Sequence, residues 1–231
     1  MKEVSGKKIP LTRIQKLIGR LMLQSKRQSA FFYLQSEADV TELSAIRKPY
    51  CKRVKERVTT NDFFFCATAR AMTKYPLMAG QLDKTGRFIE IPEHIGIGFA
   101  VSAPQGLVVP VIQDAAEKPL TKIATESAEL LKKARSNRLM PDDFYGANIA
   151  MTSLGMYGVT SFFAIAPPGV AGIISTGAID EHVVPINGDM VVRKIMSFAL
   201  AADRKIVNEF YAAKFLRHII EQIEQPLILT E

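Results

Sequence analysis

The stretch at residues 183–193, Val-Val-Pro-Ile-Asn-Gly-Asp-Met-Val-Val-Arg, predicts two strands joined by a tight turn. Its central residues, Asn187 and Gly188, both tolerate the positive φ that a two-residue hairpin requires. Apolar runs suited to strands continue outward on both sides, at residues 170–179 before the hairpin and 195–202 after it. The last third of the chain therefore predicts mainly antiparallel sheet.

Helical spacing of apolar residues predicts five helices around these strands. Pro10 and Thr12 are start signals for the first, and Asn61 and Asp62 are good N-caps for the third. The second opens at Thr41 and is expected to end near Pro49, because a proline disfavours helix in the residue before it. The five expected helices span residues 14–21, 41–48, 63–75, 120–134 and 210–223.

Further strands are expected in the first two thirds of the chain. They span residues 31–39, 95–103, 107–113 and 149–153, and the turn Pro104-Gln105-Gly106 joins the second to the third. The sum is an α+β domain in which helices pack against a largely antiparallel sheet.

The composition is that of one globular domain. The chain has 231 residues, 48% of them apolar and 23% charged, which suffices for a substantial core. We expect residues 1–8 to form a flexible N-terminal segment and residues 9–231 to form the domain. No apolar stretch approaches the ~20 residues that span a bilayer, and no signal core opens the chain. We therefore expect no membrane contact and a cytoplasmic location, or the mitochondrial matrix if the protein is eukaryotic and processed.

Few residues suit metal or redox chemistry. Cys51 and Cys66 are too few for a disulfide framework and are expected to be reduced thiols, with Cys66 buried in a helix. His94, His182 and His218 show no metal-ligand spacing, so no metal is expected. The net charge of +7 comes partly from basic runs within residues 7–27 and 47–57. These runs indicate either solvated helix faces or attraction for an anionic partner; nucleic acid fits poorly, since no recognition helix or finger spacing is present.

Six short blocks of the sequence, taken together, are informative. In chain order they are residues 9–12 (Ile-Pro-Leu-Thr), 37–43 (Glu-Ala-Asp-Val-Thr-Glu-Leu), 61–63 (Asn-Asp-Phe), 95–112, 152–158 (Thr-Ser-Leu-Gly-Met-Tyr-Gly) and 212–216 (Ala-Ala-Lys-Phe-Leu). Together they resemble the catalytic domain of the 2-oxo acid dehydrogenase acyltransferases, the group that includes dihydrolipoyl acetyltransferase. The resemblance covers nearly the whole chain. It implies a chloramphenicol acetyltransferase-like two-layer sandwich, with a mixed, mostly antiparallel sheet and helices on one face.

The activity that this resemblance implies is acyl transfer between a dihydrolipoyl thiol and coenzyme A. A thiol is a good nucleophile only as its thiolate, so a general base is needed. In the family a histidine in the motif His-x-x-x-Asp-Gly supplies it, and a Ser or Thr hydroxyl stabilises the tetrahedral oxyanion. In that family the active site lies between two subunits of a trimer, and coenzyme A and the lipoyl group enter from opposite ends of a channel.

The segment that matches the histidine motif departs from it, since residues 203–210 read Asp-Arg-Lys-Ile-Val-Asn-Glu-Phe. The strand before it and the 212–216 block after it place Arg204 at the histidine position, Asn208 at the aspartate position and Glu209 at the glycine position. A guanidinium has donors only and stays protonated, so Arg204 cannot act as the base. Losing a positioned base costs roughly 10²–10⁴ in rate. Asn208 can still orient a neighbour, whereas Glu209 adds a charged side chain where the family has room for backbone only.

Two more positions complete the candidate catalytic set of Arg204, Asn208, Thr152 and Gln15. Gln15 stands where the family's opening helix carries an arginine that pairs with the motif aspartate. We expect either an amide pair between Gln15 and Asn208 or a merely exposed Gln15. Thr152 stands at the oxyanion position and is intact, although a plainly structural role is the alternative.

These departures predict a homologue of the acyltransferase core that is catalytically impaired and serves as a structural or regulatory trimer subunit, that is, a pseudoenzyme. One alternative is an active acyltransferase that works without the usual base, with Arg204 binding an anionic substrate. A further alternative is a binding module that retains coenzyme A or an acyl-coenzyme A as a sensed ligand. The basic runs would then serve the coenzyme A phosphates.

Assembly is the expected role. We expect a homotrimer, or a mixed trimer with an active paralogue in which Thr152 completes a partner's active site, with other dehydrogenase-complex subunits as further partners. The apolar tail Pro226-Leu227-Ile228-Leu229 matches the family's tail, which docks on a neighbouring trimer to build cubes or dodecahedra; a tail packed on its own subunit is the alternative. No lipoyl or subunit-binding domain precedes residue 9 in this sequence, so no lipoyl attachment is expected in this chain.

Overall fold

A six-stranded sheet with the order β1-β10-β9-β8-β4-β7 forms the centre of the computed structural model, which describes residues 6–104 and 106–231. The pairs β1–β10, β10–β9 and β4–β7 are antiparallel, and β4–β8 and β8–β9 are parallel. The mixed, mostly antiparallel sheet is thereby confirmed. The strands are β1 (Phe31–Asp39), β4 (Gly96–Phe99), β7 (Val111–Ile112), β8 (Ala147–Ser153), β9 (Gly172–Ile186) and β10 (Asp189–Asp203).

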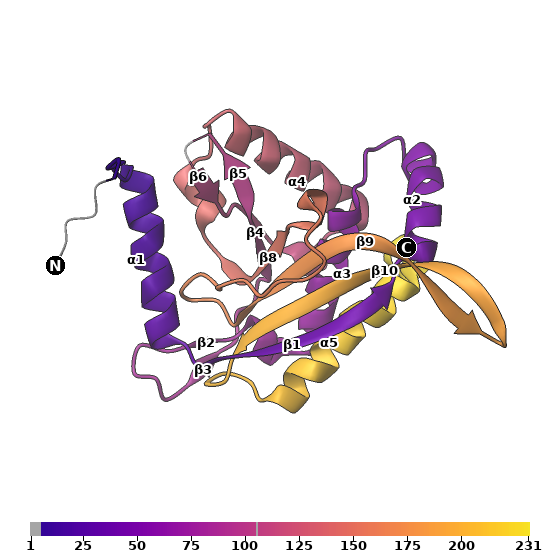
Figure 1. Ribbon diagram of the computed structural model, residues 1–231. Coiled ribbons are helices and arrows are strands. Elements are labelled where there is room, and N and C mark those ends of the chain that lie inside the picture. Colours follow the sequence, from indigo (N-terminus) through magenta and orange to yellow (C-terminus); the bar gives the residue numbers. More distant parts are fainter. Residues whose placement is uncertain (1–5, 105) are drawn as a thin grey trace.

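The hairpin predicted at residues 183–193 is confirmed and is longer than expected. The four predicted strand pieces merge into two strands of 15 residues each, β9 and β10. Asn187 and Gly188 form the turn with φ of 52° and 94°. A register shift between Met196 and Phe198 bends the ribbon, and its tip projects beyond the rest of the molecule (Figure 1).

Four helices cover one face of this sheet (Figure 1): α2 (Thr41–Val54), α3 (Thr60–Lys74), α4 (Leu120–Arg135) and α5 (Glu209–Glu224). α3 is central because it is apolar on nearly every side, and ten of its 15 residues are buried. It lies between α4 and α5 and packs Phe64 edge-on against Phe198 of β10. This face holds the main hydrophobic core, as the resemblance implied.

Helix α1 (Arg13–Gln28) stands apart from the other four (Figure 1). Thr12 caps its N-terminus, as predicted. Ser25 is its one buried residue and donates a hydrogen bond to the carbonyl of Ala166 at 2.7 Å. Leu17 and Leu23 are at least half exposed, so much of this amphipathic helix has no apolar partner within the described chain.

Three helix boundaries were predicted wrongly, the first being the end of α1, which lies at Gln28 rather than near residue 21. α2 continues through Pro49 to Val54, because the later turns bury Tyr50 against Phe63 of α3 at 6.0 Å between ring centroids. That burial offsets the ~3 kcal/mol that an interior proline costs. The N-cap of α3 is Thr59 rather than Asn61 or Asp62, and Asp62 instead closes a capping box with Thr59.

The predicted strands at residues 95–103 and 107–113 are each broken in two. β4 and β7 join the main sheet, while β5 (Val101–Ala103) and β6 (Gly106–Val108) form a separate small hairpin. The predicted turn between them includes Gln105, which lies outside the described residues. The remaining elements are β2 (Gln81–Leu82), β3 (Ile89–Glu90) and the 3-10 helices η1 (Pro76–Ala79), η2 (Ala115–Glu117), η3 (Pro141–Phe144), η4 (Gly155–Tyr157) and η5 (Pro226–Leu229).

Several composition-based expectations can be compared with the fold. Both cysteines are free thiols, and burial in α3 raises the pKa of Cys66. Over the described residues, no helix has the length and apolarity needed to cross a membrane, and no group of three or more potential metal ligands gathers. Residues 1–5 of the expected N-terminal segment lie outside the described part, so its flexibility stays a prediction.

Candidate functional site

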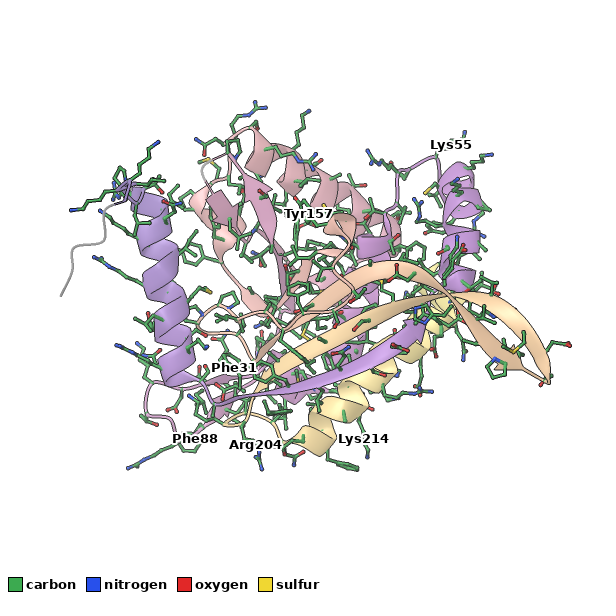
Figure 2. All side chains as sticks on the ribbon, viewed as in Figure 1. Phe31, Lys55, Phe88, Tyr157, Arg204 and Lys214 are labelled. Atoms are coloured by element: carbon green, nitrogen blue, oxygen red, sulfur yellow. The ribbon has the colours of Figure 1, made fainter. Side chains whose placement is uncertain are left out.

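Arg204 is the first residue after β10, on the loop that leads into α5 (Figure 2). Its backbone N–H donates to the carbonyl of Ala30 at 3.0 Å, which fixes the loop to the start of β1. Its guanidinium Nε donates to Glu209 Oε1 at 2.9 Å. Both side chains are about half exposed, at 53% and 56%, so the ion pair itself contributes little to stability.

Glu209 does not crowd the backbone of this loop, contrary to expectation. It is the first residue of α5, where a carboxylate interacts favourably with the helix dipole. Its side chain extends to the surface and reaches back to Arg204. The helix N-terminus therefore accommodates the larger residue at the surface of the subunit.

Asp203 is a site residue that sequence reasoning missed. It is only 4% exposed, and its Oδ1 accepts hydrogen bonds from the N–H of Ala30 at 3.3 Å and of Lys205 at 3.0 Å. The Lys205 ammonium lies 3.7 Å from Oδ2. A carboxylate directly after an apolar strand was the available signal, because a buried charge needs such partners. Asp203 holds the backbone that presents Arg204.

Asn208 and Gln15 are engaged locally and do not meet within the chain. Asn208 is the N-cap of α5, and its Oδ1 accepts from the N–H of Tyr211 at 2.9 Å. Gln15 is exposed and completes the capping box of α1 by accepting from the N–H of Thr12 at 2.9 Å. The expected amide pair is therefore absent from the described chain, which shows the exposed Gln15 of the alternative interpretation.

Thr152 lines a small pocket where the parallel strands β4 and β8 end. Ala100 follows β4, and Thr152 and Ser153 are the last residues of β8. Crevices outside the carboxyl ends of parallel strands are common ligand sites. The pocket has a volume of about 60 Å³ and is lined by Asn61, Phe64, Phe65, Ala100, Met151, Thr152, Ser153, Met156 and Thr176.

The sheet register keeps Thr152 and Arg204 far apart in one chain. Thr152 pairs with Ser175, and Ser175 with Ala199, so Ala199 lies two strands across from Thr152. Arg204 is five residues further along. At ~3.4 Å per residue and ~4.8 Å per strand, the separation is roughly 20 Å. Figure 2 agrees: Arg204 lies at one edge, whereas Tyr157, in the 3-10 helix after Thr152, lies well away from it.

No histidine replaces Arg204 in the described part of the chain. His94 Nδ1 lies 2.8 Å from Asp114 Oδ1, and His182 lies on the exposed part of β9. His218, on α5, packs near Tyr75 at the end of α3. None of them contacts Arg204 or lines the Thr152 pocket. The loop at Arg204 therefore supplies a cation and a carboxylate, and the pocket supplies hydroxyl groups.

Residues 3–230 match the sequence profile of the family described as 2-oxoacid dehydrogenases acyltransferase (catalytic domain). The chain is 32% identical over 225 residues to the dihydrolipoyllysine-residue acetyltransferase component of the pyruvate dehydrogenase complex of Rickettsia felis. The match covers 96% of this chain and 54% of that protein. The chain thus spans about half the length of the curated relatives it matches.

The chain is also similar in structure to solved acyltransferase cores. The cubic core of the pyruvate dehydrogenase multienzyme complex is 27% identical with a TM-score of 0.92, over 99% of this chain and 96% of that one. A dihydrolipoamide acetyltransferase from Azotobacter vinelandii, solved to study a serine, a histidine and an asparagine in its catalytic mechanism, is 26% identical with a TM-score of 0.92, over 98% and 95%. Chloramphenicol acetyltransferase, at 12% identity and TM-score 0.51, shares the fold alone.

Proposed function

The chain belongs to the 2-oxoacid dehydrogenase acyltransferase family, and we propose that it is a core subunit of an acyltransferase assembly with an impaired proton-abstraction step. The observation that supports this proposal most directly is the Arg204–Glu209 ion pair, at 2.9 Å, on the loop between β10 and α5. In this proposal that loop is where the family positions its histidine base.

The spacing of residues supports this assignment. In the Azotobacter vinelandii enzyme, the serine and the histidine are 52 positions apart and the histidine and the asparagine four. Thr152, Arg204 and Asn208 show the same two separations. The asparagine there also indicates that Asn208 is an ordinary variant of the motif. Arg204 is then the one departure from the motif that would impair transfer.

The chemistry explains why this departure impairs transfer. A base must accept the thiol proton of dihydrolipoamide or coenzyme A, and a guanidinium has no lone pair to offer. Glu209 is the nearest carboxylate, and its Oε1 already accepts a hydrogen bond from Arg204. The hydroxyl of Thr152 keeps the oxyanion half of the site. In this proposal the chain keeps the hydroxyl that stabilises the oxyanion and lacks the base that accepts the thiol proton.

The separation of Thr152 from Arg204 supports assembly. Two groups roughly 20 Å apart cannot act on one thioester, so a complete site requires a second copy or a paralogue. We propose a trimer in which each site lies between neighbouring subunits. In a mixed trimer, Thr152 would complete the site of a partner that supplies the base.

Two measurements on the purified chain test this function together. Light scattering should report a trimer or a multiple of it, and a monomer would contradict the assembly role. Acyl transfer from acetyl-coenzyme A to dihydrolipoamide should run roughly 10²–10⁴-fold below an active family enzyme assayed in parallel. A rate equal to that enzyme's would show that another group, such as Glu209, accepts the proton.

The C-terminal tail supports a larger assembly. Pro226 and Leu229 are buried on their own subunit, and Arg70 Nη1 donates to the carbonyl of Ile228 at 2.5 Å. Leu227 instead stays 64% exposed beside an apolar pocket of about 320 Å³ that includes Ile46 and Pro49. We propose that this surface joins trimers into a cage, as in the cubic core to which the chain is similar.

Matched substitutions separate assembly from folding at this tail. Leu227→Ala should leave the thermal unfolding temperature of the trimer unchanged and abolish particles larger than a trimer in sedimentation. Leu229→Ala should destabilise the subunit by about 2–5 kcal/mol, because it empties a fully packed site. Cages that persist in the Leu227 variant at the wild-type level would contradict the proposed contact.

A further inference from the structure

We infer that the contact proposed at the C-terminal tail brings the basic ends of two α2 helices together and holds a polyphosphate anion between them. The inference rests on the proposed cage, because it takes Leu227 as the residue that reaches a second copy of this chain. It adds a ligand class and a means of control that the proposed function leaves open. The shape of the tail surface and the charges beside it support the inference.

The tail surface carries both halves of a contact. Leu227 is its exposed apolar side chain. The adjoining pocket is lined by Leu227, Thr230 and one face of α2, which contributes Ala45, Ile46, Pro49, Tyr50 and Arg53. When two copies meet face to face about a two-fold axis, the leucine of each fills the pocket of the other. Both α2 helices then lie at the contact, each beside the other copy's tail.

Arg53 places a cation inside this contact. Its guanidinium carbon lies 5.1 Å from the centre of the Tyr50 ring, a distance at which the charge is attracted to the face of the ring. Tyr50 is itself buried and fixed in the core, so Arg53 has a defined position on the pocket wall. A two-fold contact therefore brings the guanidinium groups of two copies into one interface.

Four more exposed cations surround Arg53 on the same part of the chain. Lys48 and Lys52 each lie three residues after a pocket residue of α2, so they flank the pocket along the helix surface. Lys55 is the C-cap of α2, and Figure 2 shows it at the outer end of the helix, with Arg57 following in sequence. We call these five cations the basic patch: Lys48, Lys52, Arg53, Lys55 and Arg57.

The basic patch has little acidic charge to offset it. Glu56 is the one acidic residue within residues 48–57, so the five cations less this carboxylate leave a net charge of +4. None of the five makes an ion pair with a residue that the structure describes. The first turn of α2 and the last turn of α5 each carry an acid that is engaged elsewhere. Glu42 lies 3.8 Å from Arg193, and Glu224 accepts the N–H of Asp39.

Two basic patches that face each other oppose association. Like charges juxtaposed across an interface cost free energy, and monovalent salt only screens them. A polyphosphate anion instead carries several charges and reaches cations on both sides of the contact. Guanidinium groups pair with phosphate oxygens two at a time, which favours phosphate chemistry between the two Arg53 side chains. The contact is therefore a site for a polyphosphate that is completed only when two copies meet.

Sedimentation of the wild-type protein at a series of concentrations tests the site with sodium tripolyphosphate. The measured quantity is the subunit concentration at which half of the trimers are in cages. Tripolyphosphate should lower this concentration by about tenfold relative to sodium chloride of the same ionic strength, because it binds rather than screens. Equal effects of the two salts would overturn the inference. An increase of this concentration in sodium chloride would also overturn it, because an acid of the second copy, such as Glu231, would then neutralise the basic patch.

Paired charge-neutralising variants test the basic patch itself. Lys52→Gln with Lys55→Gln removes two charges outside the pocket, so cages should form without tripolyphosphate at about tenfold lower concentration than in wild type. Their response to tripolyphosphate should shrink. The control is Lys132→Gln with Arg135→Gln, which removes the same charge from an exposed part of α4 outside the pocket and should behave as wild type. Equal behaviour of the two double variants would overturn the inference, because net charge alone would then set assembly.

The outcomes for the proposed cage and for the anion site are distinguishable. Trimers that never form larger particles, with or without tripolyphosphate, would contradict the cage and the site together. Cages that depend on Leu227 but respond equally to both salts would leave the cage standing and refute the site alone. The rate of acyl transfer bears on neither.

Discussion

Arg204→His is expected to raise the rate of acyl transfer between acetyl-coenzyme A and dihydrolipoamide by about 10²-fold or more. An imidazole at this position is a proton acceptor near neutral pH, and positioned bases contribute roughly 10²–10⁴ in rate. The loop is already ordered for it, since the Asp203 carboxylate and the carbonyl of Ala30 hold its backbone. Initial rates at saturating thioester measure the gain.

The control is Arg204→Gln, which removes the cation without supplying a base and should stay near the wild-type rate. Equal activation of the glutamine and histidine variants would mean that the positive charge, rather than the missing base, limits transfer. If the histidine variant is active only together with Glu209→Gly, the carboxylate at the start of α5 competes for the imidazole. If neither restores transfer, the site carries a second defect.

Local signals predicted most of the fold. Aromatic and other residues suited to strands predicted both ends of β1 at residues 31–39, and the Asn187-Gly188 pair predicted the hairpin turn, because such features depend on neighbours in sequence. The end of α2 could not be predicted in this way. Its continuation past Pro49 depends on Tyr50 packing against Phe63, a contact between two helices that no local rule contains.

The sequence named candidate residues for the site but did not indicate their geometry. Flanking blocks placed Arg204 and Thr152, whereas their separation follows only from strand pairing through β9. Of the two interpretations of Gln15, the exposed one holds within the described chain, because Gln15 and Asn208 each accept from a backbone N–H at a helix start. Capping is local and competes well with a distant partner.

Phe198→Ala is expected to lower the free energy of unfolding by about 3–5 kcal/mol, the largest stability effect that we predict. Phe198 is fully buried and its ring closes on Phe64 of α3, so its removal leaves a cavity between the sheet and the central helix. Urea unfolding at one fixed protein concentration measures the change, because subunit association adds to apparent stability.

Phe88→Ala is the matched control, since the same side chain there is 69% exposed and its loss should change stability by less than about 0.5 kcal/mol. Phe198 also packs against Phe64, which lines the Thr152 pocket, so the cavity would open beside that pocket. A Phe198 variant that unfolds at the wild-type urea concentration would show that α3 and the sheet close the cavity without this ring.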